Sequence, residues 1–122
     1  MSTVAGERSL DALRERLAAF AAARDWDQFH SPKNLAMALI AEAAELVEHF
    51  QWLTEAQSRD LPPATRDAVA EELADILIYL IRTADKLEVD LLEAAWAKIG
   101  RNEERYPVER VRGSARRATE YE

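Results

Sequence analysis

ELADILIYLI, residues 72–81, is apolar on nearly every side and yet begins with two carboxylates. Glu72 and Asp75 lie three residues apart, and Asp75 is the only charged residue between Glu72 and Arg82. Helices that are apolar all round are usually buried. Because residues three apart share a helix face, this stretch predicts a buried helix with two acids on one side.

A second apolar segment repeats the arrangement. LIAEAAELV, residues 39–47, places Glu42 and Glu45 three residues apart, and no Lys or Arg occurs between Asn34 and Leu53. At about 100° per residue, Glu42 falls on the apolar stripe of the predicted helix and Glu45 flanks it. Neither glutamate therefore has a cationic partner on its own helix.

Burial of unpaired carboxylates is costly, so such groups must be protonated, paired with a cation or bound to metal. Ligand sets of oxygen atoms alone suit magnesium or manganese, and they do not suit zinc or copper. We therefore expect Glu42, Glu45, Glu72 and Asp75 to bind Mg²⁺, with Mn²⁺ as a substitute. One solvated Glu-x-x-Glu pair is common on helices, but two pairs in apolar runs favour a metal site. Arginines from elsewhere in the fold are the alternative partners.

Composition limits the class of protein. The 122 residues predict a single domain, 1–122, with a core of about 7–107 and a charged tail of 108–122. The absence of cysteine excludes disulfides, a thiol nucleophile and cysteine-based zinc sites. A net charge of −7 argues against nucleic-acid binding. Without a signal sequence or an apolar run of roughly 18 residues, we expect no membrane partner and a cytoplasmic location.

Helical periodicity and capping residues predict an all-α four-helix bundle. Ser31 followed by Pro32 is a typical helix start. The expected helices cover about residues 7–24, 31–53, 65–87 and 90–105, with a hydrophilic connection at 54–64. The second and third are so apolar that we expect oligomerisation to complete the bundle. A homo-oligomer follows, with a tetramer favoured over a dimer.

Taken together, these motifs resemble the MazG-like all-α nucleoside triphosphate pyrophosphohydrolases, and more narrowly their dCTP pyrophosphatase branch. The family signature is Glu-x-x-Glu, a spacer and Glu-x-x-Asp, which matches the four acids named above. The resemblance covers about residues 10–117. Further segments that carry it are Arg24-Asp25-Trp26, Phe29-His30, Phe50-Gln51-Trp52, Glu71-Glu72-Leu73, Arg105-Tyr106-Pro107-Val108 and Arg112-Gly113-Ser114-Ala115.

The resemblance implies magnesium-dependent cleavage of a nucleoside triphosphate between its α and β phosphates, giving the monophosphate and pyrophosphate. Glu42, Glu45, Glu72 and Asp75 would hold the metal, and one of the glutamates could act as the base. Glu48, one turn beyond Glu45, is either a supporting residue or solvated.

Six further residues are candidate substrate contacts. By the resemblance, Lys98, Asn102 and Tyr106 would reach the phosphates or the sugar, and their spacing of four places them on one helix face. A surface lysine and a packing aromatic are the alternatives for Lys98 and Tyr106. Trp26, His30 and Trp52 are candidates for base recognition, because their rings can stack on a pyrimidine. Core packing is the alternative for both tryptophans.

Two other aromatic positions and one aliphatic position bear on this interpretation. Trp96 is expected in the core, and His49 has no counterpart that we recognise in the family. Animal members of the dCTP branch have a histidine where this chain has Leu17. Cytosine is therefore the favoured base, with uracil or a modified pyrimidine left open.

Two other functions are alternatives for a helical protein with clustered acids. A di-iron carboxylate bundle needs Glu-x-x-His on two helices, and neither His30 nor His49 lies three residues after a glutamate. A non-catalytic regulatory or scaffold protein would instead pair the acids with Arg82, Arg101 or Arg105.

Overall fold

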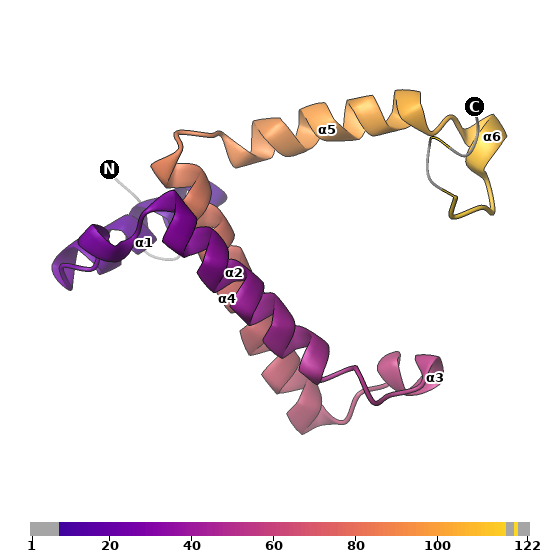
Figure 1. The fold of residues 1–122 in the computed structure, drawn as a ribbon, viewed down its shortest axis with the longest axis horizontal. Coiled ribbons are helices and arrows are strands. Elements are labelled where there is room, and N and C mark those ends of the chain that lie inside the picture. The colour runs from indigo at the N-terminus through magenta and orange to yellow at the C-terminus, as the bar shows by residue number, and fades with distance from the viewer. Residues whose placement is uncertain (1–7, 117–118, 120–122) are drawn as a thin grey trace. The chain divides into compact units, whose positions relative to one another are not determined.

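The computed structural model describes residues 8–116 and residue 119, and this part of the chain is helical and contains no strand. The all-α prediction is therefore confirmed. Figure 1 shows the elements, which are α1 (Leu10–Ala23), the 3₁₀ helix η1 (Asp27–Phe29), α2 (Pro32–Glu48), α3 (Glu55–Ser58), α4 (Pro63–Lys86), α5 (Leu91–Arg105) and α6 (Val108–Val111). None of these helices is long and apolar enough to cross a membrane.

The chain divides after Glu88 into two compact units. The first unit contains α1 to α4, and the second contains α5 and α6. The expectation of one domain over residues 1–122, completed by oligomerisation, stays a prediction.

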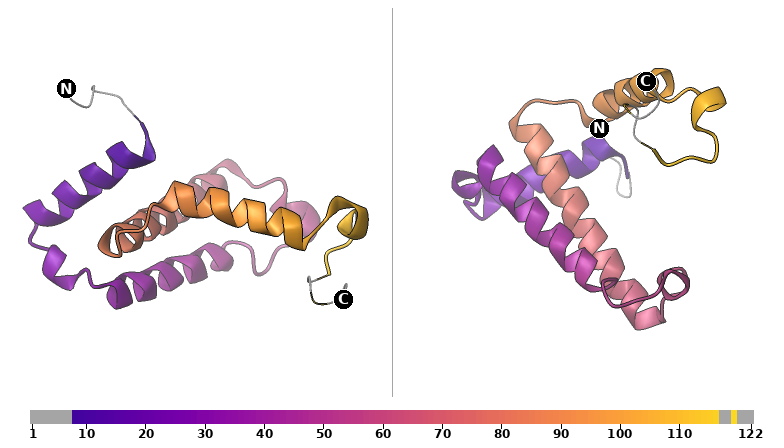
Figure 2. Two further views of the ribbon diagram at one scale, coloured as in Figure 1. Left: turned by 90° about the horizontal axis from the view of Figure 1, so that it is seen from above. Right: turned by 45° about the vertical axis from the view of Figure 1, so that its right-hand side comes forward.

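In the first unit, α2 and α4 run antiparallel and side by side, and α1 packs against α4 (Figures 1 and 2). The side chains buried between these helices are Ala21 of α1, Leu35 of α2, and Val69, Ile81 and Ala84 of α4. The two acidic helices of the sequence are therefore direct neighbours, which places their carboxylates on facing surfaces.

Local sequence explains where the helices begin. The Ser31 hydroxyl accepts a hydrogen bond from the Asn34 N–H at 3.1 Å, and Pro32 occupies the first turn of α2. The Asp90 side chain caps α5 by accepting from the Glu93 N–H at 3.0 Å. Pro63 opens α4, two residues earlier than expected. Each of the four long helices overlaps the range that the sequence predicted for it.

The prediction that the second helix continues to residue 53 is wrong, because α2 ends at Glu48. The Phe50 N–H bonds to the Val47 carbonyl at 2.9 Å, and the Leu53 N–H bonds to the Phe50 carbonyl at 2.9 Å. These three-residue bonds tighten the chain into turns. The short helices α3 and α6 were also not anticipated; α3 is held by a capping box between Thr54 and Gln57.

Leu35 is the largest fully buried side chain and is only 1% exposed. We expect Leu35→Ala to lower the free energy of unfolding by about 3 kcal/mol, because it leaves a cavity between α2 and α4. Urea denaturation followed by circular dichroism measures this loss. The exposed Lys33→Ala on the same helix is the control and should change it by less than about 0.5 kcal/mol. Equal effects of the two substitutions would contradict this packing.

Candidate functional site

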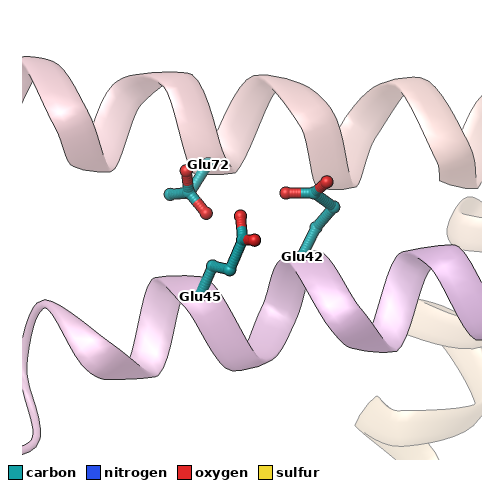
Figure 3. Close-up of side chains that lie close together, drawn as sticks. All are labelled: Glu42, Glu45 and Glu72. Atoms are coloured by element: carbon teal, nitrogen blue, oxygen red, sulfur yellow. The ribbon is translucent and has the colours of Figure 1, made fainter.

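Three carboxylates meet between α2 and α4. Glu42 and Glu45 extend from α2, Glu72 extends from α4, and Figure 3 shows their carboxyl groups pointing toward one another. One carboxylate oxygen from each residue lies within 4.8 Å of the others. Glu42 and Glu72 are half-buried, whereas Glu45 is exposed. The antiparallel packing of the two helices thus gathers three of the four acids that the sequence selected.

The cluster has no cation among the residues that the structure describes. Glu42 Oε2 and Glu72 Oε2 are buried and have no hydrogen-bond partner there. The buried Arg82 pairs instead with Asp27 at 3.0 Å and Asp85 at 3.2 Å. This finding contradicts the suggestion that Arg82 neutralises the acids. Arg101 lies on α5 in the second unit, as does Arg105, so that part of the alternative stays open.

Crowding of the acids changes their protonation. The neighbouring Glu45 carboxyl, loss of hydration and the charges of Glu45, Asp75 and Glu72 raise the pKa of Glu42 to about 7. The Glu45 carboxyl, loss of hydration and nearby negative charges also raise the pKa of Glu72. Two carboxyl groups can share a hydrogen bond only when one of them carries a proton. Without a cation, the cluster therefore holds a proton below about pH 7, and a metal ion would displace it.

The donor set suits a hard divalent cation. All the available ligand atoms are carboxylate oxygens, and two of them are buried without partners. Magnesium and manganese prefer such ligands, and they usually bind only a few carboxylates and leave the other positions to water or phosphate. Because Glu45 is exposed, the cluster is accessible to a ligand from the solvent on that side.

Asp75 lies one turn beyond Glu72 and is not among the three clustered carboxylates. Its negative charge nevertheless contributes to the raised pKa values of Glu42 and Glu72. Asp75 also lines a neighbouring cavity. It therefore stands between the acidic cluster and this cavity, and its role as a metal ligand stays a prediction.

The cavity has a volume of about 270 Å³ and is mostly apolar. It lies among α1, the segment that carries η1, and α4. Trp26 contributes to its wall, and the Trp26 ring is held edge-on against Phe20 at a centroid distance of 5.6 Å. The lining residues are Leu17, Phe20, Ala21, Trp26, His30, Asp75, Ile78, Tyr79 and Arg82.

The turn after α1 sets the position of Trp26. Asp25 adopts a left-handed conformation with φ of 53°, which aspartate tolerates better than most residues. Gln28 donates from Nε2 to the carbonyl and to the side chain of Asp25, both at 3.0 Å. The Trp26 N–H then bonds back to the Ala21 carbonyl at 2.9 Å. The chain thereby reverses and places Trp26 and His30 in the cavity wall.

Comparison with known proteins identifies this arrangement. The model of the MazG-like family matches residues 38–120. The chain belongs to the MazG-like family. The mouse (Mus musculus) protein named dCTP pyrophosphatase 1 is 47% identical over 116 residues, covering 93% of this chain and 68% of the mouse protein. The human (Homo sapiens) protein of that name is 45% identical with the same coverage.

A solved structure agrees with this MazG-like assignment. The crystal structure of a pyrophosphatase from Archaeoglobus fulgidus DSM 4304 is 34% identical in sequence and has a TM-score of 0.78. The similarity covers 87% of this chain and 99% of the archaeal chain. The recognition of the family from the sequence is thereby confirmed.

Four candidate residues of this MazG-like chain lie outside the acidic cluster's own helices or in the second unit. Trp52 follows α2 and is 86% exposed, away from the cavity wall that contains Trp26 and His30. Lys98 and Asn102 lie on α5 and Tyr106 at its end, in the second unit. Their roles and that of Trp52 stay predictions.

Trp96, expected in the core, is 71% exposed. The physical reason is that α5 has no second long helix within its own unit. Glu48 is exposed at the end of α2, which agrees with the alternative that its side chain is solvated.

From the sequence, Arg82 was expected only as an alternative partner for the acids. Its ion pairs with Asp27 and Asp85 were not predicted. The signals were a single arginine directly after an apolar run and, for Asp85 alone, a spacing of three residues from Arg82 on the same helix.

The raised pKa of Glu42 predicts how the metal-free protein responds to pH. Because ionisation of Glu42 is disfavoured in the folded state, its contribution to stability is present below its ordinary value of 4.5 and lost as the pH rises through about 7. In EDTA, the melting temperature of the wild type should therefore fall relative to Glu42→Gln over this range. Glu48→Gln is the control and should follow the wild type. Parallel curves for the wild type and Glu42→Gln would contradict the crowded acid cluster.

Proposed function

We propose that this chain is a magnesium-dependent nucleoside triphosphate pyrophosphohydrolase, and that its substrate is dCTP or a modified pyrimidine nucleotide. The reaction cleaves the bond between the α and β phosphates and gives the monophosphate and pyrophosphate. The observation that carries the proposal is the group of three facing glutamates, two of which have a buried oxygen without a partner. Support also comes from the two mammalian relatives, which are both named dCTP pyrophosphatase 1. The substrate class makes the cytoplasm the proposed location.

Glu42, Glu45, Glu72 and Asp75 are the proposed metal ligands. When bound there, Mg²⁺ neutralises charge on the phosphate oxygens and lowers the pKa of the attacking water, with Mn²⁺ as a substitute. The glutamates supply the protein's part of the reaction, because an ionised carboxylate beside the metal can accept a proton. One of them takes the proton of the attacking water.

The cavity beside Asp75 is the proposed base site. A volume of about 270 Å³ is close to the range of small-molecule pockets and has room for a nucleobase. Trp26 and His30 in its wall offer a stacking surface and a polar group. Leu17 also lines this cavity, and it is the position at which animal members of the dCTP branch have a histidine. The base preference of this chain can therefore differ from that of the animal members, and uracil or a modified pyrimidine is an alternative to cytosine.

Four other residues complete the proposed substrate contacts. Lys98, Asn102 and Tyr106 share one side of α5 and its end, where they would bind phosphate or sugar. Trp52 is exposed after α2 and does not line the cavity, so a contact between Trp52 and the base is proposed from the sequence resemblance alone.

A screen of common nucleoside triphosphates with Mg²⁺ tests the function. We expect pyrophosphate as the first product, with highest kcat/KM for a pyrimidine deoxynucleotide. Glu45→Ala should lower turnover at least 100-fold while circular dichroism retains the helical signal, because the metal and not the fold loses support. Glu48→Ala, also exposed on α2, is the matched control and should keep its activity. Orthophosphate as the first product, or an active Glu45→Ala variant, would refute the proposal.

We further propose a homo-oligomer, with a tetramer favoured over a dimer. The support is a set of exposed apolar side chains on the paired helices α2 and α4. Monomeric proteins rarely expose contiguous apolar patches of this kind. The residues are Met37, Ile40 and Val47 of α2 and Leu73, Leu77 and Leu80 of α4.

Light scattering coupled to size-exclusion chromatography tests this assembly. Ile40 is 64% exposed on α2. Ile40→Glu should shift the protein to a smaller species, because a charge would be placed in the subunit contact. Lys33→Glu, near the start of the same helix, is the control and should elute with the wild type. A monomeric wild type would refute the proposed assembly.

A further inference from the structure

The His30 ring contacts a buried arginine that has no part in the proposed metal or base site beyond lining the cavity. Arg82 of α4 is only 3% exposed. Its Nε lies 3.4 Å from His30 Nδ1, and its Nη2 lies 3.3 Å from the same atom. The guanidinium also donates from Nη2 to Asp27 Oδ1 at 3.0 Å and from Nη1 to Asp85 Oδ2 at 3.2 Å.

The chemistry of these groups decides which nitrogen of His30 carries the proton. A guanidinium has N–H donors and no acceptor, and it stays protonated in proteins. His30 Nδ1 must therefore accept, so the ring proton lies on Nε2. Loss of hydration and the positive charge of Arg82 lower the pKa of His30, against an opposing effect of Asp27, and this keeps the ring neutral near pH 7.

The consequence concerns the cavity. His30 lines it, and its Nδ1 is occupied by Arg82. The ring nitrogen left for a ligand is Nε2, which in this tautomer can only donate. A suitable ligand offers an acceptor there, such as a ring carbonyl or an unprotonated ring nitrogen. O2 and N3 of cytosine are groups of this kind.

We propose that Arg82 is a positioning residue that fixes His30 as the neutral Nε2–H tautomer, so that the cavity presents a hydrogen-bond donor to an acceptor on the base. The assignment of the tautomer stands on the contacts of Arg82 alone. The identity of the ligand as a nucleobase rests on the proposed function.

Arg82 can be replaced without leaving its two aspartate partners unpaired, because each of them has a second cation nearby. Asp27 Oδ1 also accepts from Lys86 Nζ at 2.7 Å, and Asp85 Oδ1 lies 4.0 Å from Arg14 Nε. Each aspartate therefore keeps a cation when Arg82 is replaced. Arg82→Met removes the contact with Nδ1 and retains a long side chain. Asp85→Asn is the matched control, because it weakens an ion pair of Arg82 that does not involve His30.

The first readout is the ¹⁵N NMR spectrum of the histidine side chains in the free, full-length protein at neutral pH. We expect the His30 Nδ1 resonance of the wild type and of Asp85→Asn at the position of an unprotonated nitrogen. In Arg82→Met it should move toward that of a protonated nitrogen. A wild type with a protonated Nδ1, or an Arg82→Met variant with an unchanged tautomer, would overturn the proposal. So would an equal shift in Asp85→Asn, which would indicate a general structural effect.

The second readout is steady-state kinetics with dCTP and Mg²⁺. Loss of one oriented hydrogen bond predicts an about five- to tenfold higher KM for Arg82→Met, with kcat changed less than about twofold. His30→Gln, whose amide can donate from a position near Nε2, should retain more of the affinity than His30→Leu. Equal KM values for these two His30 variants would refute the donor role. If no triphosphate is hydrolysed, the proposed function fails and the NMR result still decides the tautomer.

Discussion

The structure depends on carboxylates held face to face between two apolar helices. Packing of α2 against α4 buries Leu35 and, in the same layer, leaves an oxygen of Glu42 and one of Glu72 without partners. This arrangement is unfavourable for the protein alone, because like charges at close range raise the cost of ionisation. A divalent cation would reverse the sign of the interaction. Folding and metal binding would then be coupled at one place in the molecule.

Much of this could be predicted from the sequence, because the relevant signals are local. Ser31 with Pro32 set the start of α2, and the spacing of Glu42 and Glu45 places both on one face whatever the rest of the chain does. The end of α2 could not be predicted in this way. Apolar residues continue past Glu48, but their backbone bonds tighten into turns, and apolar content does not distinguish a turn from another helical turn.

Long-range pairing was the part that the sequence did not contain. Asp27 and Arg82 are separated by 55 positions, so no helical spacing relates them. Arg82 ends an apolar run and could have paired with the acids, with solvent or with a distant loop. The tertiary contact of η1 with α4 decides among these, because it brings Asp27 to the guanidinium, whereas Asp85 lies on α4 itself, three residues after Arg82. Asp75 is a similar case. Its spacing from Glu72 predicts which helix face it lies on, but not whether its side chain joins the carboxylate cluster or lines the cavity.

One face of α4 joins the proposed metal site to the cavity. Glu72, Asp75, Tyr79 and Arg82 follow one another at intervals of three or four residues, so they form a line along the helix. The line begins at the carboxylate cluster, passes the cavity wall and ends at the guanidinium that contacts His30. A rigid helix therefore sets the separation between the cation that would bind phosphate and the ring that would contact the base. A nucleotide that spans this separation can engage both groups, whereas a free base or a free polyphosphate can engage only one.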